Sequence, residues 1–577
     1  MKILLIQPPI QDFYQTSIRT QPIGLAYLAT SLMRHGHEVE ILDCQTEKKR
    51  SIPIPSELSY LKDFYPFNDR NPFKLYSGYY HFGMGWDEIR KKIEDSRADV
   101  FGISSNFTPY HGEALEIARI IKEWNRRKIV VMGGAHVSCD PDGVLKNPLV
   151  DYVILGEGEI RFQLLLEQIE KGKIERIEEI DGIGYRVNGE IRISPLKNFV
   201  KDLDSLPYPA RELLDLGRYQ MKKKRSIMII TSRGCPHGCA YCSTHLVMGA
   251  SFRTRSPEAI LEEMMECRNR YGIQIFDIED DNFTFDQERA KRLMALIIET
   301  FGEQVLELTA MNGVSFASLD GKLLRLMKRA GFHTINLSFV STDPSTKKRM
   351  GRPVAETDFD DILEEAEKVS LNVIAYAIFG MPGQTIEEMV NTLIYLMGKR
   401  VLIGPSVYYP TPGTNLFRKC KEMGILPSHS SQWRSSALPI ETKEFNRLDI
   451  VTLLRLARTI NFIKGKIDKG ELNEGITWKE LSQIMKAKAK VRVKVKAETE
   501  NKVKVEDEVK FYSTCNKSEL ITWVDLLLLL FNKRSFFGIR KDFWKRTSIF
   551  KEETSKKVLN HFFEKAWEKP ILKSRND

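Results

Sequence analysis

The sequence has 577 residues, too many for one hydrophobic core, so its length predicts two to four domains. Apolar residues make up 42% of the chain and charged residues 28%, which is typical of a soluble globular protein and excludes a disordered or membrane-embedded one. The 87 basic residues exceed the 77 acidic ones by only 10 charges, so we expect no nucleic-acid partner on this ground.

The chain begins with a short apolar run, Met1 to Ile6, that Gln7-Pro8-Pro9 ends before a signal peptide would be complete. We interpret this run as a buried strand. Elsewhere no window offers the roughly 20 uninterrupted apolar residues of a membrane-spanning helix. The sequence therefore predicts a cytoplasmic protein without a transmembrane segment.

Short apolar runs alternate with helical patterns over residues 1–170, which indicates a doubly wound, Rossmann-like parallel sheet. The strands are expected at 3–6, 39–42, 100–104, 129–132 and 152–155, with helices at 24–35 and 112–125 among the segments between them. Residues 47–86 interrupt this alternation with a Pro- and aromatic-rich stretch. We expect that stretch to be an insertion with little regular structure.

Residues 171–222 are predicted to be a linker that contains a hairpin around Asn188-Gly189. Strand and helix alternation then resumes over residues 223–434. Its strands are expected at 227–231, 273–279, 306–311, 334–339, 373–379 and 406–409. Six such units predict a partial (β/α)6 barrel of the TIM type, and residues 435–577 are expected to be mainly helical.

Three of the eight cysteines, Cys235, Cys239 and Cys242, fall within eight residues directly after the first barrel strand. Such clustering in a large chain favours metal ligation over disulfides. Three thiolates on one loop can hold three corners of an iron–sulfur cube and leave the fourth iron open, as a catalytic site requires. The alternative is a zinc-binding, non-enzymatic interaction module whose fourth ligand is His237 or His245.

This loop, with an aromatic residue at Tyr241 before the third cysteine, resembles the signature of the radical S-adenosylmethionine (SAM) superfamily. The resemblance implies a 4Fe-4S cluster that binds and reductively cleaves S-adenosyl-L-methionine to a 5′-deoxyadenosyl radical. It also implies an electron donor such as a flavodoxin or ferredoxin.

The family's second-strand motif contacts the methionine end of the cosubstrate, so the resemblance makes Asp280, Asp281 and Asn282 candidate ligands; capping of the following helix is the alternative role. Ser338 and Ser341 are candidates for the ribose, although this chain has Val340-Ser341 where many relatives carry a Glu-Ser pair. Gly380 and Pro382 are candidates for the wall near the adenine. They also suit an ordinary turn.

A doubly wound domain binds its ligand where the loops after its strands converge. Together with the cluster domain, these loops resemble the cobalamin-binding class of radical SAM enzymes over residues 1–430. The candidate cobalamin contacts are Ser104, Ser105, Gly133, Gly134 and Gly156. The Asp-x-His-x-x-Gly motif, by which many cobalamin proteins supply a histidine to cobalt, is absent. We expect His111 and His136 to be polar surface or capping residues in loops rather than cobalt ligands.

The resemblance implies a methyltransferase, or an enzyme of rearrangement or oxidative cyclisation, that acts on an unactivated carbon. A second enzyme hypothesis is a radical SAM methylthiotransferase acting on RNA. That family needs further cysteines in the first domain, where only Cys44 and Cys139 occur. The substrate is expected to be a small molecule, or a lipid-like one if the apolar run at 523–539 forms an interfacial lid.

Overall fold

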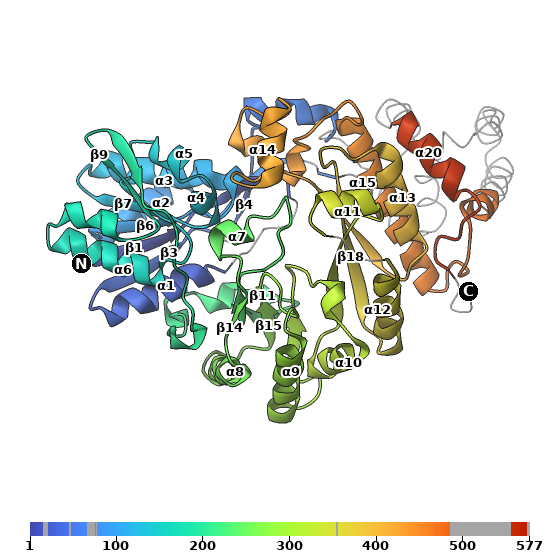
Figure 1. Ribbon diagram of the computed structural model, residues 1–577, viewed down its shortest axis with the longest axis horizontal. Helices are drawn as coiled ribbons and strands as arrows, with labels where there is room; N and C mark the ends of the chain where they lie inside the picture. Colours follow the sequence, from blue (N-terminus) through green and yellow to red (C-terminus); the bar gives the residue numbers. More distant parts are fainter. Residues whose placement is uncertain are drawn as a thin grey trace, which may run out of the picture.

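The computed structural model describes residues 1–14, 21–45, 48–65, 75–76, 78–352, 356–484 and 555–573 (Figure 1). The apolar run at 523–539 therefore lies outside the described residues. In the view of Figure 1 the first sheet lies on the left and the barrel strands lie at the centre and right, with the short helix α7 (Thr244–Val247) between them.

The N-terminal part is built on one seven-stranded sheet, and its five-stranded parallel part confirms the prediction of a doubly wound domain. The strand order is β10-β9-β8-β7-β6-β1-β3, and the first two strands are antiparallel. The bounds are β1 (Lys2–Gln7), β3 (Glu38–Asp43), β6 (Val100–Ser104), β7 (Ile129–Gly133), β8 (Tyr152–Ile154), β9 (Ile183–Val187) and β10 (Glu190–Ile193). Strands β9 and β10 form the hairpin expected around Asn188-Gly189.

Side-chain alternation along β1 supplies two cores, one on each face of this sheet. Leu4 and Ile6 pack with helices α2 (Trp86–Ser96) and α3 (His111–Trp124), whereas Ile3 and Leu5 pack with α1 (Ile23–Arg34) and α6 (Gly158–Glu170). Short helices α4 (Ala135–Cys139) and α5 (Pro141–Leu145) follow β7. The chain reverses its direction of travel across the sheet between β1 and β6, so a ligand site is expected at the loops that follow these strands.

The prediction of little regular structure at 47–86 is wrong. A second, antiparallel sheet has the order β2-β5-β4, formed by β2 (Ile10–Asp12), β4 (Lys49–Ile52) and β5 (Tyr79–Phe82). The rings of Phe13 and Tyr79 meet edge to face beside it, with centroids 4.9 Å apart, and belong to the barrel's core. The aromatic residues of this stretch therefore form a packed layer instead of a loose loop.

Six parallel strands form the partial barrel that the sequence predicts. Four neighbouring strands have the order β11-β12-β15-β16, and three more have the order β17-β18-β19. Single bridges, Leu308 to Phe332 and Val314 to Leu337, join the two groups. The strands are β11 (Gln220–Met221, antiparallel), β12 (Lys224–Ile229), β15 (Ile275–Ile278), β16 (Glu307–Thr309), β17 (Thr334–Val340), β18 (Asn372–Phe379) and β19 (Leu402–Val407).

Helices connect these strands and cover the outside of the barrel (Figure 1). They are α8 (Pro257–Tyr271), α9 (Gln287–Phe301), α10 (Gly321–Ala330), α11 (Pro344–Arg349), α12 (Glu356–Lys368), α13 (Ile386–Met397) and α14 (Asn415–Glu422). A two-stranded ladder, β13 (Ser232–Arg233) with β14 (Arg253–Thr254), encloses the cysteine loop. Beyond the barrel, α15 (Arg447–Asp468) and α20 (Lys556–Ala566) pack on α13, as expected of a helical C-terminal region. None of the described helices has the length and apolar character to cross a membrane.

Candidate active site

The cysteine loop leaves β12 at the carboxyl end of the barrel and is held there by backbone bonds. Gly234 has φ +82°, and a Cβ on it would lie 2.3 Å from the carbonyl oxygen of Ser251, so only glycine fits. Ala240 donates its backbone N–H to Met350 (3.1 Å) and accepts from that of Leu416 (2.9 Å). Both ends and the middle of the loop are thus fixed to the barrel.

The three predicted cluster ligands lie together on this loop. Burial raises the pKa of the Cys235 and Cys239 thiols above the ordinary value, and each thiol feels the charge of Cys242. Among the described residues no three His, Cys, Asp or Glu side chains converge as ligands of a single metal ion. The wider spacing of ligands around a cube suits three cysteines on separate corners, so the donor set fits an iron–sulfur cluster.

Asp280 and Asp281, which the sequence nominates as cosubstrate ligands, are used by the structure to hold the cysteine loop. Asp280 is 2% exposed and accepts hydrogen bonds from the backbone of Thr231 (2.7 Å) and the hydroxyl of Ser232 (2.6 Å). Asp281 accepts from the N–H of Gly234 (3.1 Å) and the hydroxyl of Thr244 (3.0 Å). Neither residue caps α9, because Asp286 does so.

Asn282 differs from these two aspartates because its side chain has an unused acceptor. The residue is 4% exposed, and its Nδ2 lies 3.9 Å from Cys235 Sγ. Its buried Oδ1 has no hydrogen-bond partner in the described part of the chain. An unpartnered buried acceptor costs free energy, so this oxygen fits a donor on a bound molecule such as the ammonium group of S-adenosylmethionine.

Arg352 is a site residue that sequence reasoning missed. Its Nη2 donates to Ser338 Oγ, and its guanidinium lowers the pKa of the neighbouring Cys239 thiol, opposing the larger effect of burial. Burial raises the pKa of Tyr241 to about 12, again with Arg352 acting in the opposite sense. A guanidinium beside the cluster ligands fits a carboxylate. Only its place three residues after α11, in Gly351-Arg352, could have indicated it.

Of the two serines predicted at the ribose, the structure places only Ser338 beside this cluster of side chains. The register of β17 against β18 shifts between Ser338 and Val340, which has φ +72°. Ser341 is consequently 1% exposed, and its hydroxyl lies 3.4 Å from Glu388 and from Thr392. The Ser341 hydroxyl thus has protein partners here, and its contact with a ribose stays a prediction.

Gly380 and Pro382 form the turn after β18. Gly380 has φ +81°, and Gln384 closes the turn by accepting from the N–H of Met381 (2.8 Å) and donating to the carbonyl of Ile378 (3.1 Å). This geometry supports the ordinary turn interpretation. Contact of these residues with an adenine stays a prediction.

Four of the predicted cobalamin contacts converge at the carboxyl edge of the first sheet. Ser104 and Gly133 are partners in register, and Ser105 donates its N–H to the carbonyl of Gly133 (2.8 Å). Gly134 has φ +114°, and a Cβ there would lie 2.6 Å from Asn106 Oδ1. A Cβ on Gly133 would contact only the carbonyl oxygen of Ile154, at 3.7 Å. The edge therefore combines fixed loops with open space, as a large flat cofactor requires.

Gly156 occupies a different position from these four. Its N–H donates to Ser138 (2.9 Å), and a Cβ on it would lie 3.2 Å from the carbonyl oxygen of Val247 in α7. Gly156 thus allows the first sheet to pack against the helix that follows the cysteine loop. Cys139 in α4 also hydrogen-bonds Ser243, next to Cys242. The cobalamin edge and the cluster loop are therefore in direct contact.

His111 and His136 form a pair at this edge, with ring centroids 4.4 Å apart. His111 Nδ1 lies 3.0 Å from Ser105 Oγ, and His136 Nδ1 lies 3.1 Å from Thr108 Oγ1. Burial lowers the pKa of His111 to about 3 and that of His136 to about 4, so both rings are neutral at pH 7. His111 is the first residue of α3 and His136 lies in α4, so neither is in a loop, and each ring is hydrogen-bonded to a hydroxyl.

A buried acid lies under the same loops. Glu113 in α3 is 7% exposed, and burial raises its pKa to about 7, with Arg434 opposing the effect. Because the native state holds this proton more tightly than the unfolded state, the free energy of unfolding falls as pH rises from about 4.5 to 7, by at most about 1.4 kcal/mol per pH unit.

Glu113→Gln is therefore expected to flatten the pH dependence of stability over that interval. Urea unfolding followed by circular dichroism at several pH values measures the slope. Glu116→Gln, at a partly exposed site on the same helix, should keep the wild-type slope. Equal slopes in wild type and Glu113→Gln would contradict the prediction.

The fold and site define an enzyme in which a cofactor-binding doubly wound sheet faces an iron–sulfur barrel, and comparison with known proteins agrees. Residues 229–396 match the Radical SAM superfamily model, and residues 77–166 match the B12 binding domain model. The chain is a cobalamin-binding member of the radical SAM superfamily. Its cofactors are accordingly a 4Fe-4S cluster, S-adenosyl-L-methionine and cobalamin, as predicted.

The chain aligns with most of the length of two curated relatives. The chain is 28% identical over 474 residues to the uncharacterized methyltransferase PH0819 of Pyrococcus horikoshii, covering 81% of this chain and 94% of that protein. It is 26% identical over 475 residues to the cytidylyl-2-hydroxyethylphosphonate methyltransferase of Streptomyces wedmorensis, covering 75% and 84%. These matches support a cobalamin-dependent radical SAM methyltransferase. They give no support to the RNA methylthiotransferase or to the zinc-binding module.

Among solved structures, the chain resembles the radical S-adenosylmethionine methyltransferase TsrM from Kitasatospora setae, which has cobalamin and a [4Fe-4S] cluster bound. The TM-score is 0.56 at 18% identity, over 73% of this chain and 75% of that one. At this identity the likeness concerns the fold, and it confirms the order of a doubly wound domain followed by a barrel.

Proposed function

We propose that this protein is a cobalamin-dependent radical SAM methyltransferase that methylates an unactivated carbon of a small-molecule or lipid-like substrate. The observation that supports this most is the direct contact between the two cofactor sites. Gly156 of the first sheet packs on α7, and Cys139 of that sheet's α4 bonds next to the cluster ligand Cys242. Both methyltransferase relatives resemble the chain over cluster barrel and cobalamin domain alike.

The cluster and its cosubstrate supply a carbon radical when bound, and cobalamin supplies a methyl carrier. The chain's own residues bind and orient these groups. Cys235, Cys239 and Cys242 would hold the cluster, and Asn282 Oδ1 would accept a hydrogen bond from the cosubstrate ammonium. Arg352 would pair with its carboxylate. Ser338, held by Arg352, would offer its hydroxyl to the ribose.

Electrons for the cluster must come from outside the chain, and we propose a flavodoxin or ferredoxin as donor. The exposed residues Pro236, His237 and Gly238 lie between the first two cluster ligands. This segment offers a short path for an electron from the surface to the cluster.

The proposal is tested without knowing the substrate. The anaerobic holoenzyme is incubated with S-adenosylmethionine and a chemical reductant, and S-adenosylhomocysteine and 5′-deoxyadenosine are quantified. We expect both products. Methyl transfer to the corrinoid converts S-adenosylmethionine to S-adenosylhomocysteine, whereas radical formation converts it to 5′-deoxyadenosine. Release of 5′-deoxyadenosine without any S-adenosylhomocysteine would overturn methyl transfer and leave a rearrangement or cyclisation.

A further inference from the structure

Four buried charged side chains join the edge of the first sheet to the cluster loop. Arg233 donates to Glu157 (2.9 Å) and to Glu159 (2.7 Å), and Arg253 donates to Glu157 as well (2.8 Å). The side chains of these four residues, here called the charged bridge, are 1 to 8% exposed. The carboxylates of Glu157 and Glu159 face Arg233 on the barrel side.

The charged bridge lies on a very short path between the two cofactor sites. Glu157 comes directly after Gly156 and follows β8, at the cobalamin edge of the first sheet. Arg233 is two residues before the cluster ligand Cys235. Arg233 and Arg253 are cross-strand partners in the β13–β14 ladder, so both guanidiniums are fixed by paired backbone.

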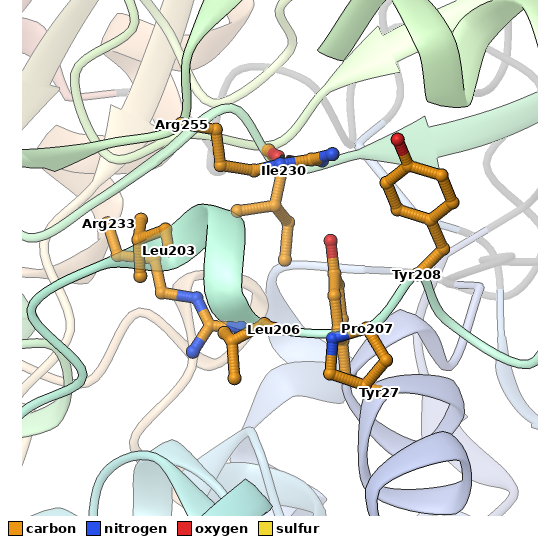
Figure 2. Close-up of a pocket in the computed structure, with 8 residues that line it drawn as sticks. All are labelled: Tyr27, Leu203, Leu206, Pro207, Tyr208, Ile230, Arg233 and Arg255. Carbon is orange, nitrogen blue, oxygen red and sulfur yellow. Dashed lines mark hydrogen bonds between the residues drawn. The ribbon is translucent and has the colours of Figure 1, made fainter. Parts of the chain in front are cut away.

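The space around the bridge leaves little freedom to move. Figure 2 shows Arg233 and Arg255 around a small cavity lined by Tyr27 of α1 and by Pro207 and Tyr208 of the linker. The cavity has a volume of about 10 Å³, no more than a water molecule needs. The Arg233 guanidinium also lies over the Tyr27 ring, 5.4 Å from its centroid. Rigid, buried and multiply bonded arginines are suited to fixing a register between two elements.

We infer that Arg233 and Glu157 are positioning residues that fix the cluster loop relative to the corrinoid edge. They touch neither reacting group. Their function is to hold the two cofactor sites in one geometry, and a displacement of about 1 Å between reacting groups costs about 10²-fold in rate. Loosening the bridge should therefore affect the relation between the two cofactors more than either cofactor alone.

The test compares wild type with Glu157→Gln and Arg233→Lys in the anaerobic holoenzyme. Electron paramagnetic resonance measures the magnetic interaction between the reduced cluster and cobalt(II) of the bound corrinoid. We expect one well-defined interaction in wild type and a weakened or broadened one in both variants, with iron and corrinoid content retained. Unchanged interactions in both variants would overturn the inference.

Glu263→Gln is the matched control. Glu263 in α8 is also 1% exposed and also binds two arginines, Arg211 and Arg255, whose guanidiniums donate to the carbonyls of Met228 and Ile230, ahead of the cysteine loop. It should lower thermal stability comparably and leave the magnetic interaction as in wild type. If Glu157→Gln does not fold, Glu159→Gln takes its place, since it leaves the pair of Arg253 with Glu157 intact.

A second readout rests on the proposed methyl transfer. In the bridge variants the ratio of S-adenosylhomocysteine to 5′-deoxyadenosine should fall, by up to about 10²-fold for a displacement near 1 Å. An unchanged ratio, together with an altered magnetic interaction, would overturn the catalytic consequence of the inference. If wild type forms no S-adenosylhomocysteine, the methyl-transfer proposal fails while the spectroscopic comparison still decides the positioning role.

Discussion

Cys239→Ala is expected to lose the iron–sulfur cluster and, with it, cleavage of S-adenosylmethionine by more than about 10³-fold. The three ligands leave no spare thiolate, because the cube needs all three protein corners to keep the fourth iron open. Cys239 is 7% exposed and lies near Tyr241 and Arg352, neither of which can replace its thiolate as a cluster ligand. Iron and sulfide counting and the yield of 5′-deoxyadenosine measure the effect.

The choice of Cys239 over Cys242 follows from the structure. Cys139 hydrogen-bonds Ser243 and lies near Cys242, so a variant of Cys242 would leave a second thiol close to the vacant corner. The control is Cys420→Ala, a fully buried thiol in the hydrophobic core whose Sγ lies 3.8 Å from Tyr408 Oη. It should keep the cluster. A wild-type cluster and wild-type cleavage in Cys239→Ala would refute the assignment of the loop.

The fold was largely predictable because it rests on local periodicity. Apolar runs of strand length marked β1, β6, β7 and the barrel strands, and Asn188-Gly189 marked a hairpin turn. The three-stranded sheet of β2, β4 and β5 was missed for a physical reason. Ile10 of β2 pairs with Phe82 of β5, far along the chain, and aromatic side chains around Phe13 pack beside the sheet, which no local pattern reveals.

Site residues could be predicted where their role depends on their spacing in the sequence. They could not be predicted where their role depends on the direction in which a side chain points. Three cysteines on one loop can be identified in sequence. The sequence could not distinguish Asp281, which bonds the loop, from Asn282, whose oxygen is free, because the difference lies in where each side chain points. The sequence also could not show the bulge after Ser338, beyond which the Ser341 hydroxyl lies 3.4 Å from Thr392. Arg352 was missed because it approaches Cys239 only in the folded chain.

Asn282→Leu should separate cosubstrate binding from cluster assembly. Leucine has a similar shape and removes the buried Oδ1, which has no partner among the described residues. A hydrogen bond to a charged group contributes about 1.5–3 kcal/mol, so the dissociation constant of S-adenosylmethionine should rise about 10- to 100-fold. Equilibrium dialysis of the reconstituted protein, with iron content as a check on the cluster, measures the change.

Two further variants make this prediction specific to the ammonium group. Asn282→Asp keeps an acceptor and adds a negative charge, so it should bind the cosubstrate at least as tightly as wild type. Ser341→Ala removes a hydroxyl that the structure places against Glu388 and Thr392, and its dissociation constant should not change. If Asn282→Leu bound as tightly as wild type, or if Ser341→Ala weakened binding equally, Oδ1 would not be the acceptor. The buried Oδ1 would then need a different hydrogen-bond partner. An unpaired Oδ1 would cost as much free energy in the enzyme with bound S-adenosylmethionine as in the enzyme without it.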